Sequence, residues 1–270
     1  MKSVNAGTNG VSGALKFFAG TTSSGASGAV IIKTGSATNG KSGSITLSVG
    51  NGNTGAGGDI ELFGGLSNGA TGGTISIATG YGMTSTSGSL SIQSVNAGTN
   101  GISGSLSFSS GTTSSGSSGQ ISFTSGAATH GKGGDISLAV GSGNTGVGGD
   151  ISGSAGSSTA ATGGSISLST GAGRDTSSGS VVLKTVNAGT NGVSGSLKFS
   201  SGTSSKGTSG AISFRTGTAT HGKGGDFSLI VGSGTSTSGG DLTMIAGETT
   251  AASSLGGAVK ITAGLGSSTS

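Results

Sequence analysis

The amino-acid sequence predicts an all-β protein, a parallel β-solenoid with about 17 coils of 15 residues each. Three observations lead to this fold class: a fixed 15-residue period, alternation of apolar and polar residues within each period, and a glycine at the start of every unit. Such regularity favours an ordered repeat over an ordinary globular domain.

Composition limits the classes of protein to which the chain can belong. The 270 residues include 63 Gly but no Pro, Cys or Trp, and the chain lacks the Gly-X-Y register of collagen. Disordered chains combine high net charge with low hydrophobicity. Here the apolar fraction is 30%, the formal net charge is only +4, and the apolar residues are regularly spaced. Composition therefore favours an ordered chain.

The repeat is the pattern glycine, any, apolar, any, apolar, any, small, glycine. It occurs 17 times, and 13 of the 16 spacings are 15 residues, two are 16 and one is 17. We expect the first-position glycine to lie at a corner that needs positive φ or a close approach of backbones. These corner glycines are Gly13, Gly28, Gly43, Gly58, Gly73, Gly88, Gly104, Gly119, Gly134, Gly149, Gly164, Gly179, Gly195, Gly210, Gly225, Gly240 and Gly257.

Each unit predicts one strand with a buried face, because its third and fifth positions are apolar and two residues apart. The only exception is Gly153, at a fifth position. The tenth position is always small, and we expect it to lie on a thin return arm against the strand. The residues predicted to form the core ladder are Leu15, Phe17, Val30, Ile32, Ile45, Leu47, Ile60, Leu62, Ile75, Ile77, Leu106, Phe108, Ile121, Phe123, Ile136, Leu138, Ile166, Leu168, Leu197, Phe199, Ile212 and Phe214.

Coils that stack about 4.8 Å apart would form a rod roughly 80 Å long. An antiparallel meander is the alternative arrangement. Parallel stacking is favoured over it, because only parallel coils place identical side chains directly above one another.

A longer period indicates duplication of a six-unit block. The phrase VNAGTNG begins at Val4, Val95 and Val186, 91 residues apart. The first and last units lack a polar capping repeat, so we expect a segment of a longer array or a subunit that stacks end to end. The predicted organisation is one continuous array over 1–270, with superrepeats 4–94, 95–185 and 186–270, the last incomplete.

The phrase THGKGGD, at 129–135 and again at 220–226, is the strongest candidate for a chemical site. A site here would use His130, Lys132 and Asp135, with His221, Lys223 and Asp226 as its second copy. In a solenoid the two copies would lie about 29 Å apart and could not form one centre. No nucleophile or second base accompanies either copy, so we expect solvated residues, no catalysis and no enzyme.

Calcium is the one cofactor that the sequence leaves open, and only as incidental binding. The pairs Asp135/Asp150 and Asp226/Asp241 are each 15 residues apart, so they would stack on adjacent coils. Carboxylates about 5 Å apart repel one another unless water or a cation lies between them.

Charge and hydropathy limit the partners. The 12 Lys and Arg residues are dispersed without interleaved aromatic residues, so we expect no nucleic-acid binding. No run of 18 apolar residues predicts a membrane span. The Ser/Thr residues could accept O-glycans. They also define the alternative function, a solenoid that binds ice, glycan or mineral through its outward Ser/Thr face.

The phrases GGTISIATG (72–80), GGDISLAVG (133–141) and GGSISLSTG (163–171) carry a family resemblance. The chain resembles, over essentially its whole length, Gly/Ser/Thr-rich repeat proteins of diatom-like algae, which are assigned to cell surfaces and extracellular material. The resemblance implies an extracellular structural role. The predicted function is therefore a non-enzymatic, rigid extracellular or cell-surface rod or filament that associates with itself end to end or laterally.

Overall fold

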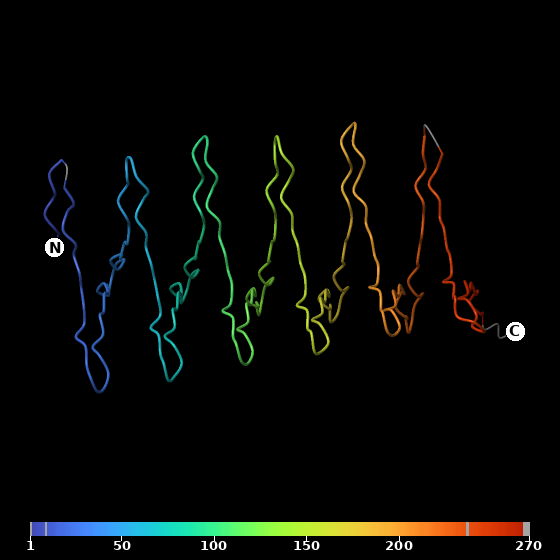
Figure 1. The fold of residues 1–270 in the computed structure, drawn as a ribbon, viewed down its shortest axis with the longest axis horizontal. Coiled ribbons are helices and arrows are strands. Elements are labelled where there is room, and N and C mark those ends of the chain that lie inside the picture. The colour runs from blue at the N-terminus through green and yellow to red at the C-terminus, as the bar shows by residue number, and fades with distance from the viewer. Residues whose placement is uncertain (1, 9, 236–237, 267–270) are drawn as a thin grey trace. The chain divides into compact units, whose positions relative to one another are not determined.

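The computed structural model describes residues 2–8, 10–235 and 238–266, and none of them lies in a helix or a β-strand. Figure 1 accordingly shows irregular ribbon that is interrupted by loops. The predicted parallel β-solenoid is therefore wrong, and so is the antiparallel meander. Two predictions that depend on the solenoid are also wrong: the stacking of coils about 4.8 Å apart and the rod length calculated from it.

The backbone hydrogen bonds show why no sheet forms. The described residues make ten of them, and each joins residues that are ten or fewer positions apart. No backbone hydrogen bond therefore connects one inner segment to the next. Isolated strands are unstable in water, and a sheet needs neighbouring strands that share a hydrophobic face. The apolar alternation that predicted strands is therefore not accompanied by any strand among the described residues.

The structure nevertheless follows the 15-residue period. Each unit consists of an inner segment, positions one to seven, and a loop from the eighth position to the first position of the next unit. A backbone hydrogen bond closes the neck of the loop in several units. The N–H of Gly73 donates to the carbonyl oxygen of Gly65 at 2.8 Å, and equivalent bonds join Gly88 to Gly80, Gly134 to Gly126, Gly164 to Gly156, Gly179 to Gly171 and Gly257 to Gly247.

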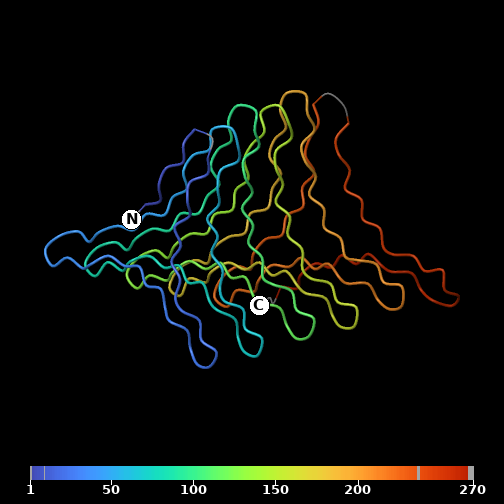
Figure 2. The same ribbon diagram turned by 60° about the vertical axis from the view of Figure 1, so that its left-hand side comes forward.

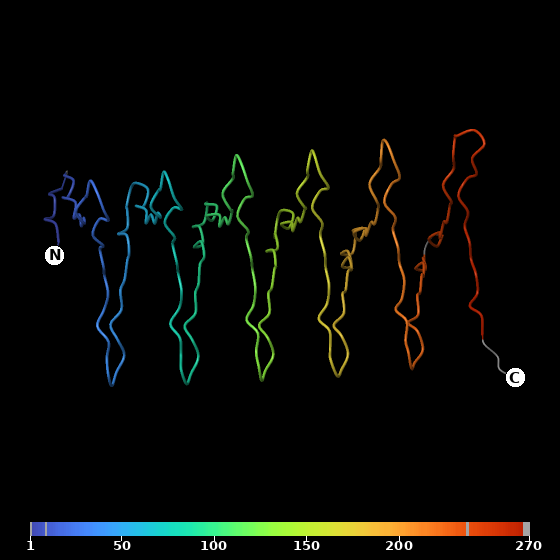
Figure 3. The ribbon, with the colours of Figure 1, turned by 90° about the horizontal axis from the view of Figure 1, so that it is seen from below.

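The chain divides into two compact units, Met1–Ser137 and Leu138–Ser270. Within the first, the ribbon repeatedly runs out into a rounded loop and returns (Figure 2). Figure 3 shows the same alternation of inner segment and loop within the second. The division falls inside the inner segment that begins at Gly134, so it does not follow the boundaries of the 91-residue superrepeats.

No described residue is buried, so the chain has no hydrophobic core in the part that the structure describes. The 22 predicted ladder residues range from 46% exposed at Ile121 to 79% exposed at Leu168. The physical reason lies in the unit itself. Two large apolar side chains per 15 residues cannot offset the conformational entropy of ordering a glycine-rich segment unless other segments cover them.

Candidate functional site

The inner segments present their apolar residues unevenly to solvent. Third-position residues are 46–65% exposed, whereas apolar residues at the fourth and sixth positions, such as Ile31 and Phe63, are 73–86% exposed. Apolar residues in the loops are the most exposed, with Val147 at 96%. Apolar fifth-position residues range from 54% exposed at Ile92 to 87% at Ile261 and overlap this second group, so only the third position is consistently less exposed. We call the third- and fifth-position apolar residues the ladder face.

Charged residues avoid this face. Within the inner segments they occupy only the second, fourth and sixth positions, as Asp59, Glu61 and Lys33 illustrate. All other charged residues and both histidines lie in the loops. The ladder face is therefore uncharged along every described inner segment. A half-exposed apolar surface free of charge has the composition of the centre of a protein–protein interface.

Two aromatic pairs lie on the ladder face. The rings of Phe108 and Phe123 meet edge to face, with centroids 6.2 Å apart and planes at 86°. Phe199 and Phe214, which occupy the same positions 91 residues later, repeat the arrangement at 6.0 Å and 83°. Such T-shaped pairs are worth about 0.5–1.5 kcal/mol beyond their burial. Contact therefore exists between ladder residues of successive units, although it does not bury them.

The loop necks bring other atoms close to the glycine at the first position. All 17 corner glycines have a heavy atom within 4 Å of the place where a Cβ would stand. In most units that atom belongs to the seventh-position side chain of the preceding unit, such as Val140, whose Cγ1 would lie 2.6 Å from a Cβ on Gly149. At Gly73, Gly149 and Gly240 the nearest atom would lie less than 3.0 Å from a Cβ, so a larger residue would force the neck to shift, whereas at eight other corners it lies at 3.4–3.8 Å, which is ordinary van der Waals contact.

The corner glycines do not have positive φ. The described glycines with left-handed φ are Gly25, Gly116 and Gly207, all at the thirteenth position of their units and 91 residues apart. Sequence reasoning missed them because it assigned special backbone geometry to the corners. The signal available in the sequence was a Ser- or Lys-preceded glycine that recurs once in each superrepeat.

The tenth position is small for a local reason and not because it packs against a strand. Thr22 and Thr113 fold back within their own loops, where each hydroxyl donates to the carbonyl oxygen two residues ahead at 2.8 and 2.9 Å. Where the tenth residue is Gly143, a Cβ would lie 2.6 Å from the carbonyl oxygen of Gly146. Each loop therefore closes on itself at this position.

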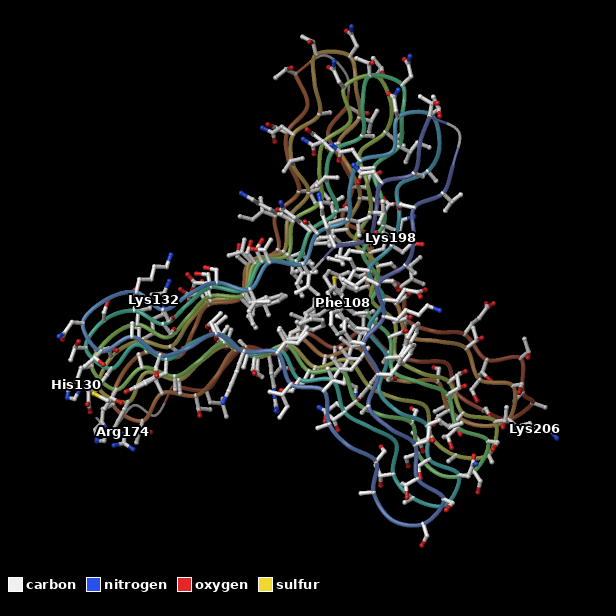
Figure 4. All side chains as sticks on the ribbon, turned by 90° about the vertical axis from the view of Figure 1, so that its left-hand side faces the viewer. Phe108, His130, Lys132, Arg174, Lys198 and Lys206 are labelled. Carbon is white, nitrogen blue, oxygen red and sulfur yellow. The ribbon has the colours of Figure 1, made fainter. Side chains whose placement is uncertain are left out.

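The THGKGGD loops each hold an ion pair. Lys132 Nζ lies 2.7 Å from a carboxylate oxygen of Asp135, and Lys223 Nζ lies 2.8 Å from one of Asp226. All four side chains are at least 75% exposed. Figure 4 shows His130 and Lys132 on a loop that extends away from Phe108. The side-chain hydrogen bond of this loop joins Lys132 to Asp135, and among the described residues His130 makes none.

We expect His130→Ala to leave the chain unchanged and Lys132→Ala to have only a local effect. An ion pair this exposed contributes about 0–1 kcal/mol, because water and salt screen it. The check is the side-chain carboxylate ¹³C shift of Asp135, which should move in Lys132→Ala but not in His130→Ala. A widespread change of the NMR spectrum in His130→Ala would show that the imidazole has a role in the structure.

The calcium candidates do not assemble into a recognisable site. Asp135 and Asp226 are engaged by lysines, whereas Asp150 and Asp241 form no ion pair among the described residues. Nowhere in the described ranges do three or more His, Asp or Glu side chains gather as metal ligands. Incidental calcium binding therefore stays a prediction.

No family model, no curated protein and no solved structure matches this chain. Among the described residues there is also no helix with the length and hydropathy to cross a membrane. The algal resemblance drawn from the repeat phrases remains a prediction.

Proposed function

We propose that this chain is a non-enzymatic structural protein of extracellular material, and that it functions by packing its ladder face against the ladder faces of other copies. The observation that carries the proposal is the exposure of the regularly spaced ladder residues, 46–79% across the 22 positions. A face of this kind gains free energy when it leaves water.

The most suitable occupant of the ladder face is a second copy of the chain. Every copy presents the same uncharged apolar positions at the same 15-residue spacing, so two copies match over many units. The net charge of +4 over 270 residues opposes such association only weakly. Because each unit adds a similar contribution, affinity grows with the number of units that pair.

The extracellular assignment rests on the Gly/Ser/Thr-rich phrases and their algal resemblance. The non-enzymatic assignment rests on the loops, where no described hydrogen bond engages either histidine and the side chains of the two lysine–aspartate pairs are at least 75% exposed.

The proposal is tested by sedimentation velocity and electron microscopy over a concentration series of the purified chain. We expect particles that grow with concentration into elongated assemblies, since repeated faces pair without a fixed end point. A chain that stays monomeric up to millimolar concentration would overturn the proposal. Extracellular placement is tested separately, by immunolabelling of intact source cells.

A further inference from the structure

We propose that three loops are sites of spontaneous covalent modification, in which Asn39, Asn51 and Asn68 convert to aspartate and isoaspartate. Each of these residues precedes a glycine, namely Gly40, Gly52 and Gly69. The reaction needs no enzyme and no oxidant. Its only co-reactant is water, which every described loop meets.

The step is an intramolecular acyl transfer. The backbone nitrogen of the glycine attacks Cγ of the preceding asparagine, and the new N–Cγ bond closes a five-membered succinimide ring. The Cγ–Nδ2 bond breaks, and the side-chain nitrogen leaves as ammonia after it takes up the amide proton. Water then opens the ring at either carbonyl and restores a peptide bond, which runs through the α-carboxyl in aspartate and through the side chain in isoaspartate.

The structure leaves the attacking nitrogen free in these three loops. Among the described residues, no hydrogen bond uses the N–H of Gly40, Gly52 or Gly69. At Gly40 and Gly69 no heavy atom lies within 4 Å of the Cβ position, so the space around the glycine is open. Both lie in bends, at 38–40 and 68–70.

Of the three remaining Asn-Gly pairs, that of Asn9 lies outside the described residues, and the other two lie in turns that slow the reaction. The N–H of Gly101 donates to the carbonyl oxygen of Gly98 at 3.3 Å, and the N–H of Gly192 donates to that of Gly189 at 3.2 Å. These bonds close four-residue turns. Attack by either nitrogen on Asn100 or Asn191 first requires its turn to open. The chain thus carries reactive and protected copies of the same dipeptide.

The modification changes the charge of the loops. Each conversion adds one carboxylate, so three conversions lower the formal net charge from +4 to +1. A net charge near zero promotes association between chains. The isoaspartate form also lengthens the backbone by one methylene within a loop that otherwise follows a fixed repeat.

The test is a time course of the full-length chain at mildly alkaline pH and low concentration, followed by peptide mapping with tandem mass spectrometry. Cleavage after lysine releases residues 34–41, which report Asn39 alone. We expect the three sites whose glycine N–H makes no described hydrogen bond to convert about two- to tenfold faster than Asn100 and Asn191, the factor that one backbone hydrogen bond supplies.

Two controls distinguish the effect of the turns on the conversion rate from the effect of the local sequence. In concentrated urea the rates of all five sites should converge, because the turns at Gly101 and Gly192 are lost. Gly40→Ala, which the open space at Gly40 accommodates, should slow conversion of Asn39 and leave Asn68 unchanged. Equal rates at all five sites in the native chain, or a difference that persists in urea, would overturn the proposal.

Discussion

Replacing Leu106, Phe108, Ile121 and Phe123 together by serine is expected to weaken self-association about a thousandfold, measured by sedimentation equilibrium. These four residues form the ladder face of two successive units and include one edge-to-face aromatic pair. Each is between 46% and 68% exposed, so roughly half of its surface remains to be covered by a partner. A loss of roughly 1 kcal/mol at each position accumulates to about a thousandfold in the dissociation constant.

A second variant with the same number of substitutions serves as the control. Val11, Ile102, Val147 and Val193 are aliphatic loop residues that are all at least 96% exposed. Their combined replacement by serine removes as many large apolar side chains as the first variant but leaves the ladder face intact. Association should therefore be nearly unchanged. The opposite ranking, with the loop variant dissociated and the ladder variant still assembled, would show that the loops form the interface.

Gly73→Ala is expected to open the loop from Gly65 to Gly73. A Cβ at position 73 would lie 2.7 Å from the backbone nitrogen of Gly65, a separation that real Cβ atoms do not adopt. The neck must therefore widen, and the 2.8 Å hydrogen bond between the two glycines breaks. We expect amide hydrogen exchange at residue 73 to accelerate up to about tenfold, the contribution of one such bond.

Gly65→Ala is the matched control for the neck. It lies on the other side of the same hydrogen bond, but nothing stands within 4 Å of its Cβ position. The amide at position 73 should therefore keep its slow exchange in this variant. The neighbouring neck between Gly80 and Gly88 serves as an internal reference in both variants. Equal acceleration in Gly65→Ala and Gly73→Ala would attribute the effect to loss of glycine flexibility and not to crowding at the neck.

Much of the local architecture was predictable from the sequence. The 15-residue unit reappears as an inner segment and a loop, and third-position residues such as Leu106 are less exposed than apolar residues at the fourth and sixth positions such as Phe63. These features are local, because they depend on side-chain direction along an extended segment and on glycine at crowded necks. The tenth position was misassigned, since the hydroxyl of Thr22 bonds within its own loop.

Local sequence features could not decide whether the chain forms a β-solenoid. Parallel stacking requires backbone hydrogen bonds between segments that are far apart in sequence, and a periodic pattern is compatible with such bonds without requiring them. Likewise, the THGKGGD phrase showed a histidine, a lysine and an aspartate close in sequence. Only the structure showed that Lys132 pairs with Asp135 while His130 stays apart.

The sequence by itself determined the length of the repeat, the position of its apolar residues and the placement of glycine at the necks, because neighbouring residues impose these features on one another. The tertiary structure decided whether the segments pair, and it showed that they do not: no strand forms and no side chain is buried among the described residues. The physical reason is that segments pair only if the free energy gained by burying apolar surface between them exceeds the conformational entropy lost on ordering the chain. Both quantities are sums over segments far apart in sequence, so the sequence of one unit does not determine them.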